Sequence, residues 1–63
     1  MNLLKFNLQY IKLVDTDGNS HMGYAHYCDK EDYEAKEDGL EMKVGNDICI
    51  FYESDIKSIK ILD

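Results

Sequence analysis

Short runs in which apolar and polar residues alternate, separated by glycine-containing turns, constrain this chain to a fold built mainly from β-strands. Leu40–Val44 alternates throughout, and the turn Gly45-Asn46-Asp47 leads into Ile48–Tyr52. Alternation places successive side chains on opposite faces of a sheet, and Gly and Asn suit the tight turn of a hairpin. Residues 40–52 therefore predict a β-hairpin. Its second strand is apolar on both faces, which predicts a central strand or a contact with another subunit.

A second pair of strands is predicted on either side of the turn Asp15-Thr16-Asp17-Gly18-Asn19. Residues 11–13 alternate before this turn, and Ser20–Cys28 follows it with two tyrosines and no carboxylate or lysine. Aspartate side chains bond nearby backbone N–H groups, and glycine adopts a positive φ without steric cost. Gly23 lies inside the second strand, where a missing side chain indicates a sharp bend or the close approach of another backbone.

The N-terminal residues are compatible with more than one local structure. Residues 4–8 alternate as a strand would, with a one-residue slip near Tyr10 that a bulge, a bend or two separate strands would produce. The same stretch also places Leu4, Leu8 and Ile11 on one face of a helix.

The C-terminal residues predict one helical turn and a closing strand. Ile56 and Ile59 stand three residues apart after Glu53-Ser54-Asp55, which is the spacing of a tight helical turn. Alternation then resumes in Ile59-Lys60-Ile61.

A chain of 63 residues can build one small hydrophobic core, so residues 1–63 are expected to form a single domain. The longest uncharged apolar run, Ile48–Tyr52, is far shorter than the roughly 18 residues of a membrane span. Met1–Tyr10 lacks the cationic start and the long apolar stretch of a signal peptide. We therefore expect a cytoplasmic protein without membrane contact, in which Cys28 and Cys49 stay reduced.

The net charge of the chain is −6, and most of it lies in one segment. Residues 29–41 hold seven carboxylates against two lysines, whereas the other fifty residues nearly balance. Because this segment would repel phosphates and the chain has no arginine, direct nucleic-acid binding is disfavoured. The segment is either a solvated loop that keeps the protein monomeric or a docking surface for a basic partner. Its sequence fits an irregular loop or a short helix capped by Asp29 and ended by Gly39.

The order of the predicted elements and three short stretches together indicate a family. The stretches are Ile11-Lys12-Leu13 before Asp17-Gly18, then Gly23-Tyr24-Ala25, then Ser54-Asp55-Ile56 leading to Ile59-Lys60-Ile61. Over about residues 10–62 the chain resembles the small SH3-like barrels, and most of all the bacterial Sm-like proteins. The resemblance implies a mainly β fold, a five-stranded SH3-like (Sm-like) barrel. A short helix in the acidic segment or at the N-terminus would be compatible with it.

The positions that bind RNA in the Sm family differ in this chain. RNA-binding members place an Asp, an apolar residue and an Asn after the second strand, and an Arg-Gly pair between the fourth and fifth strands. Here those places read Asp29-Lys30-Glu31-Asp32 and Tyr52-Glu53-Ser54-Asp55. The groups that contact bases and phosphates are missing, so the resemblance implies the fold without this RNA site.

No set of residues has the spacing of a metal site or a catalytic centre. Aligning Gly18 with the sixth position of a calcium loop puts Tyr24 at the twelfth, where a bidentate carboxylate is needed. Among the few zinc ligands, His26 and Cys28 are expected to share a strand face, with Cys49 as a neighbour across the sheet. Exposed carboxylates with ordinary pKa values are poor acids at neutral pH. We expect no metal, no cofactor and no enzymatic activity.

The acidic segment is therefore the candidate site. The leading hypothesis is a non-catalytic protein-interaction module that binds a basic partner through residues 29–41, together with an exposed strand edge that could also pair two copies. The alternatives are an acidic mimic of nucleic acid, which would inhibit a DNA- or RNA-binding protein, and a degenerate Sm-like protein that binds RNA weakly through stacked tyrosines. Tyr33 would be an anchor for a partner or a clasp that folds back onto the barrel. The candidate contact residues are Asp29, Glu31, Asp32, Tyr33, Glu34, Glu37 and Asp38.

Overall fold

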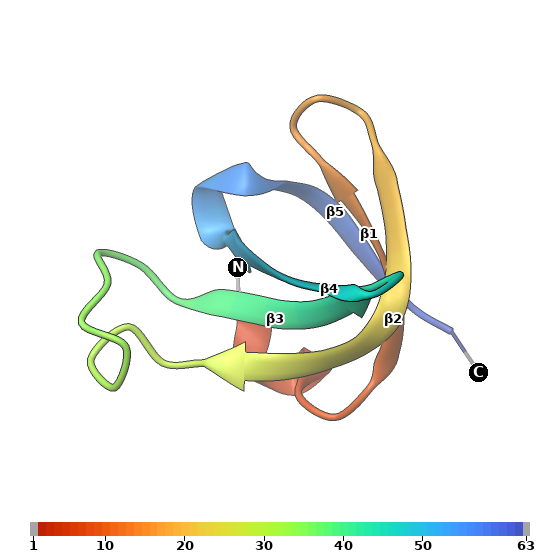
Figure 1. Ribbon diagram of the computed structural model, residues 1–63. Helices are drawn as coiled ribbons and strands as arrows, with labels where there is room; N and C mark the ends of the chain where they lie inside the picture. The colour runs from red at the N-terminus through yellow and green to blue at the C-terminus, as the bar shows by residue number, and fades with distance from the viewer. Residues whose placement is uncertain (1, 63) are drawn as a thin grey trace.

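The computed structural model describes residues 2–62 and shows a mainly β protein with five antiparallel strands in one sheet (Figure 1). The elements in chain order are η1 (Leu3–Phe6), β1 (Tyr10–Asp15), β2 (Ser20–Cys28), β3 (Gly39–Val44), β4 (Asp47–Tyr52), η2 (Glu53–Asp55) and β5 (Ile56–Ile61). In space the order is β4-β3-β2-β1-β5, so β4 and β5 are the edges. Both η elements are short 3-10 helices. Within residues 2–62, no helix has the length and apolar surface that crossing a bilayer requires.

The longest strand, β2, joins the two halves of the sheet. Its first half pairs with β1, where Ile11 is opposite Gly23, and its second half pairs with β3, where Ala25 is opposite Met42. Figure 1 shows β2 curving from one partner to the other. A Cβ atom built on Gly23 would lie 2.9 Å from the carbonyl oxygen of Lys43. The close approach of another backbone, predicted for Gly23, is confirmed.

The hydrophobic core draws residues from both halves of the sheet and from η1. Its buried members are Leu3, Phe6, Ile11, Leu13, Ala25, Leu40, Met42 and Ile56. Burying a Leu or Phe side chain contributes about 1.5–3 kcal/mol. The two residues from η1 therefore make this short helix part of the core.

At the N-terminus, a 3-10 turn replaces the strand predicted over residues 4–8, and the alternative helical face is also wrong. Leu4 and Leu8 are 56% and 69% exposed, whereas Leu3 and Phe6 are buried. The reason is the tight turn, which places residues three apart on the same side. A short N-terminal helix, one of the two positions that the resemblance allowed, is present.

Both predicted hairpins form. A helical turn is present between β4 and β5, but it lies at Glu53–Asp55, and the Ile56–Ile59 spacing that predicted it falls within β5. The last strand begins at Ile56, three residues earlier than expected. Because β4 is an edge strand, the interpretation of Ile48–Tyr52 as a central strand is wrong. Ile48 and Ile50 point outward from β4 and are exposed. This face of the strand is therefore apolar although no other part of the described chain covers it. The contact with another subunit stays a prediction.

We expect Gly23→Ala to lower the free energy of unfolding by about 1–3 kcal/mol, because the added methyl group would meet a backbone carbonyl that cannot rotate away. Urea denaturation followed by circular dichroism measures the loss. Ser20→Ala, at an exposed position of the same strand, is the control and should change stability by less than about 0.5 kcal/mol. A Gly23→Ala protein as stable as the wild type would contradict the close contact.

Candidate functional site

The connection between β2 and β3 is the most acidic part of the molecule. Residues 29–38, which we call the acidic loop, hold six carboxylates against two lysines and project from one end of the sheet (Figure 1). The predicted boundary at residue 41 is wrong, because residues 39–41 begin β3. The loop forms turns over residues 30–34 and no helix, so the irregular alternative is the correct one.

Two carboxylates close the acidic loop on itself. Asp29 Oδ1 accepts a hydrogen bond from the Glu31 N–H at 2.8 Å. Asp38 Oδ1 accepts from the Lys30 N–H at 2.9 Å and joins the two ends of the loop. The Ala35 N–H donates to the Lys30 carbonyl at 2.8 Å. These bonds give the loop a defined shape.

Glu37 ties the acidic loop to η2. Its two carboxylate oxygens accept from the N–H and the hydroxyl of Ser54, at 2.6 and 2.9 Å. Beside this contact, the Glu53 N–H donates to the Asp38 carbonyl at 3.1 Å. Hydrogen bonds to an ionised carboxylate are stronger than those between neutral groups. The acidic loop and η2 therefore form one continuous surface.

The other three carboxylates of the loop are available to a partner. Glu31, Asp32 and Glu34 are exposed, and within residues 2–62 their side chains have no hydrogen-bond or ion-pair partner. Glu34 has a φ of 51°, in the left-handed region. That conformation costs a residue with a side chain roughly 1–2 kcal/mol.

Tyr33 lies between these acids, at 46% exposure. The Cys28 thiol beside its phenol raises the pKa of Tyr33, and burial and the Glu41 and Asp32 carboxylates add to this. Because Cys28 is a buried residue of β2, the tyrosine folds back toward the sheet while part of its ring stays accessible. The roles of clasp and anchor are thus compatible in one side chain.

Tyr27 supports the base of the acidic loop, although no sequence pattern singled it out. Its half-buried side chain packs against the core, and its N–H donates to Asn7 Oδ1 at 2.9 Å. Burial raises the pKa of Tyr27, together with the hydrogen-bonded Asp38 carboxylate and the charges of Asp29 and Glu53. The only available signal was its place just before the acidic segment.

An open hollow of about 470 Å³ lies between the acidic loop and η2. Carboxylates, an aromatic ring and a hydroxyl line it: Glu34, Ala35, Lys36, Glu37, Tyr52, Ser54 and Asp55. An open hollow of this kind can receive a side chain of a protein partner.

The β1–β2 turn brings a further carboxylate close to η2. Asp15 Oδ1 accepts from two backbone N–H groups of its own turn, at 2.9 and 3.0 Å, and Oδ2 lies 2.9 Å from His21 Nε2. The hydrogen bond with His21 lowers the pKa of Asp15, and the turn's N–H groups lower it further. The Thr16 N–H donates to the Asp55 carbonyl at 3.0 Å, which joins this turn to η2.

Metal-ligating residues are dispersed. In the described part of the chain, no three His, Cys, Asp or Glu side chains are placed to hold an ion. His26 and Cys28 share a face of β2, as predicted, because the pairing of β2 with β3 runs without a shift from Ala25 to Cys28. Cys28 is nevertheless buried, with Tyr33 beside its thiol, whereas His26 is exposed. The expected neighbour Cys49 is opposite Met42, on the other face of the sheet, so that part of the prediction is wrong. Cys28 and Cys49 are free thiols.

No protein-family model, curated protein or solved structure matches this chain. The seven predicted contact residues fall into three groups in the structure. Three carboxylates shape the acidic loop, three are available, and Tyr33 lies between the loop and the sheet. Such an arrangement can accept charge-assisted hydrogen bonds from lysine or arginine side chains.

Glu37→Ala should release the acidic loop from η2, because both oxygens that bind Ser54 are lost. We expect faster amide hydrogen exchange at Ser54 and a loss of about 1 kcal/mol in the free energy of unfolding. Exchange measured by NMR, residue by residue, tests this. Glu34→Ala is the matched control and should leave Ser54 unchanged. Slow exchange at Ser54 in both variants would show that Glu37 does not hold the loop.

Asp15 should make the fold sensitive to acid. Its pKa is lower in the folded state, so its contribution is present above the ordinary aspartate pKa and is lost as pH falls through the folded value. Urea midpoints measured from about pH 5 down to about pH 2 should fall in the wild type and fall less steeply in Asp15→Asn. Asp17→Asn, at an exposed position of the same turn, should keep the wild-type slope. Equal slopes for Asp15→Asn and the wild type would rule out this role.

Proposed function

We propose that this protein is a non-catalytic interaction module: an SH3-like (Sm-like) β-domain whose acidic loop binds a basic segment of a partner protein. The sheet order β4-β3-β2-β1-β5, the bend of β2 and the helical turn between β4 and β5 support the SH3-like assignment. The unpaired edges of β4 and β5 would let a partner, or a second copy, add backbone hydrogen bonds to the contact.

The division of roles among the six carboxylates of the acidic loop carries this proposal. Those that hold the loop are Asp29, Glu37 and Asp38, and those available to a partner are Glu31, Asp32 and Glu34. A surface that is already in its bound shape loses less conformational entropy on association. A loop that served only to keep the protein in solution would not need to be fixed to η2.

Glu34 gives further support. Its left-handed backbone would suit Gly or Asn better, yet the chain keeps a long carboxylate there, at the rim of the hollow. Strained residues occur preferentially at functional positions. The strain at Glu34 is explained if its carboxylate contacts the partner.

The nucleic-acid mimic is a special case of the same surface, in which the basic partner is a DNA- or RNA-binding protein. Direct binding of nucleic acid by the acidic loop is disfavoured, because its carboxylates would repel phosphates. The two cases differ in whether added duplex DNA competes with this protein for its partner.

Replacing Glu31, Asp32 and Glu34 together by Gln, Asn and Gln should weaken binding of a fluorescent lysine-rich peptide by about tenfold. Three exposed ion pairs worth about 0.5 kcal/mol each sum to the roughly 1.4 kcal/mol that a tenfold change requires. Fluorescence anisotropy at low and high salt measures the affinity, which should also fall with salt.

The control neutralises two exposed carboxylates outside the acidic loop, Asp17 and Asp47, and should lose much less affinity. A second variant, Glu34→Gly, relieves the backbone strain and should weaken binding without lowering the free energy of unfolding. Equal losses in the acidic-loop and control variants would mean that only net charge matters, and the proposal would be wrong.

A further inference from the structure

The outward face of β5, β1 and β2 differs from the rest of the surface in its charge. The strand register places eight outward side chains there, none of them a carboxylate in a chain that has thirteen. We call them the lysine–tyrosine face: Tyr10, Lys12, Val14, Ser20, Met22, Tyr24, Ser58 and Lys60. Seven are exposed, whereas Ile11 and Leu13 on the inward side of β1 are fully buried.

Two rows of side chains cross this face. Lys12 stands opposite Met22 on one neighbouring strand and opposite Lys60 on the other. In the next row Tyr10 stands opposite Tyr24, with the two rings edge to face and their centroids 5.4 Å apart. Tyr24 is 70% exposed, and Tyr and Met are enriched where proteins meet other proteins. The face thus has an apolar, aromatic centre flanked by ammonium groups.

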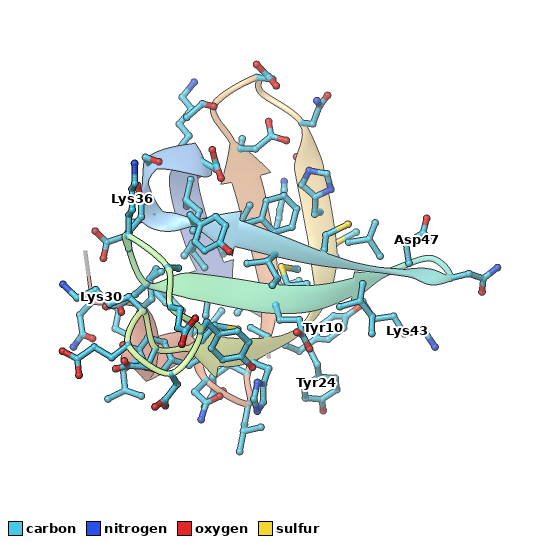
Figure 2. The ribbon with its side chains drawn as sticks, turned by 60° about the vertical axis from the view of Figure 1, so that its left-hand side comes forward. Tyr10, Tyr24, Lys30, Lys36, Lys43 and Asp47 are labelled. Atoms are coloured by element: carbon cyan, nitrogen blue, oxygen red, sulfur yellow. The ribbon has the colours of Figure 1, made fainter. Side chains whose placement is uncertain are left out.

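The lysine–tyrosine face and the acidic loop occupy separate parts of the surface. Figure 2 shows Lys30 and Lys36 of the acidic loop at the left and Tyr10 and Tyr24 away from them, below the centre of the view. Attraction between exposed charges falls off within a Debye length of about 8 Å at physiological ionic strength. The face itself holds no carboxylate that could neutralise Lys12 and Lys60.

We propose that the lysine–tyrosine face binds the acidic loop of a second copy of this chain, in a head-to-tail contact. The inference rests on the proposed function, because it names the basic partner of the acidic loop. In this contact Lys12 and Lys60 meet the available carboxylates of the loop. Tyr33 packs against Tyr24 and Met22.

The two surfaces match in layout as well as in sign. In the acidic loop an exposed tyrosine is surrounded by three available carboxylates, and on the face an exposed tyrosine pair is flanked by two lysines. An apolar centre with a charged rim is the usual anatomy of a protein interface, and the rim pairs mainly set orientation. A nucleic-acid strand would find only two ammonium groups in these rows, whereas the acidic loop complements both the centre and the rim.

A contact between two different surfaces leaves one acidic loop and one lysine–tyrosine face free at the ends of every open assembly. Copies joined in this way form a ring where the rotation closes, or a filament where it does not. The assembly therefore grows with concentration and weakens with salt, and it does not stop at a two-fold dimer.

Sedimentation and light scattering of the full chain, under reducing conditions, test the contact. The wild type should exceed twice its 7.3 kDa mass at high concentration in about 0.15 M salt and return toward monomer in about 1 M salt. The face variant, Lys12→Glu with Lys60→Glu, should stay monomeric. So should the loop variant, in which Glu31, Asp32 and Glu34 become lysine. Mixing the two variants should restore assembly, because the reversed face then meets a reversed loop.

Two controls separate this contact from general charge effects. Lys5→Glu with Lys57→Glu changes the net charge as the face variant does, at exposed lysines outside the face, and should assemble like the wild type. Tyr24→Ala changes no charge and should weaken assembly by removing the apolar centre. Circular dichroism confirms that each variant is folded.

The outcomes distinguish the two proposals. A wild type that stays monomeric while its acidic loop still binds the lysine-rich peptide overturns the head-to-tail contact and leaves the proposed function in place. A wild type that neither assembles nor binds the lysine-rich peptide overturns both the head-to-tail contact and the proposed function. A monomeric wild type that retains a single-stranded oligonucleotide, when the face variant does not, assigns the face to nucleic acid and overturns the contact between copies.

Discussion

The close contact between β2 at Gly23 and the carbonyl oxygen of Lys43 is the constraint on which the rest of the structure depends. With no side chain between the two backbones, one strand can pair with β1 through its first half and with β3 through its second. Both halves of the sheet then contribute to one core, to which η1 adds Leu3 and Phe6. A chain of 63 residues is too short to build a second layer of secondary structure over the sheet. The bend in β2 covers the core instead, by folding one half of the sheet over the other.

The same bend determines where the acidic loop lies. The second half of β2 ends at Cys28 and β3 begins at Gly39, so the ten residues between them leave the sheet at the end where η2 joins β4 to β5. Glu37 can then reach Ser54, although the two are 17 residues apart. Repulsion among neighbouring carboxylates would extend a free loop, and the bonds to backbone N–H groups offset that repulsion. An acidic segment that is fixed in this way has a shape that a partner can recognise.

The sequence predicts what depends on near neighbours. The hairpin turns and the close approach at Gly23 were predicted correctly, because each of these depends on a few adjacent residues. The Ile56–Ile59 spacing, by contrast, predicted a helical turn and belongs to β5, while the turn itself lies just before it. The pairing of strands that are far apart in the sequence could not be predicted. An apolar strand such as Ile48–Tyr52 has the same sequence pattern whether it lies at the centre or at the edge of a sheet. The roles of the acidic residues could not be predicted for the same reason, since the contact that distinguishes Glu37 is made with Ser54, 17 residues away.

Net charge is the quantity most easily taken from a sequence, and in this protein it describes the surface poorly. Lys12 and Lys60 lie at opposite ends of the chain and become neighbours only because β1 pairs with β5. The net charge of −6 implies repulsion between distant copies. Because salt screens charges over about 8 Å, the interaction at a contact is determined by the groups that lie there. A sheet sorts side chains by register, so two lysines can share a face that contains no carboxylate while six acids gather in one loop. The chemistry of a partner therefore follows from the register of the strands and cannot be derived from the sum of the charges.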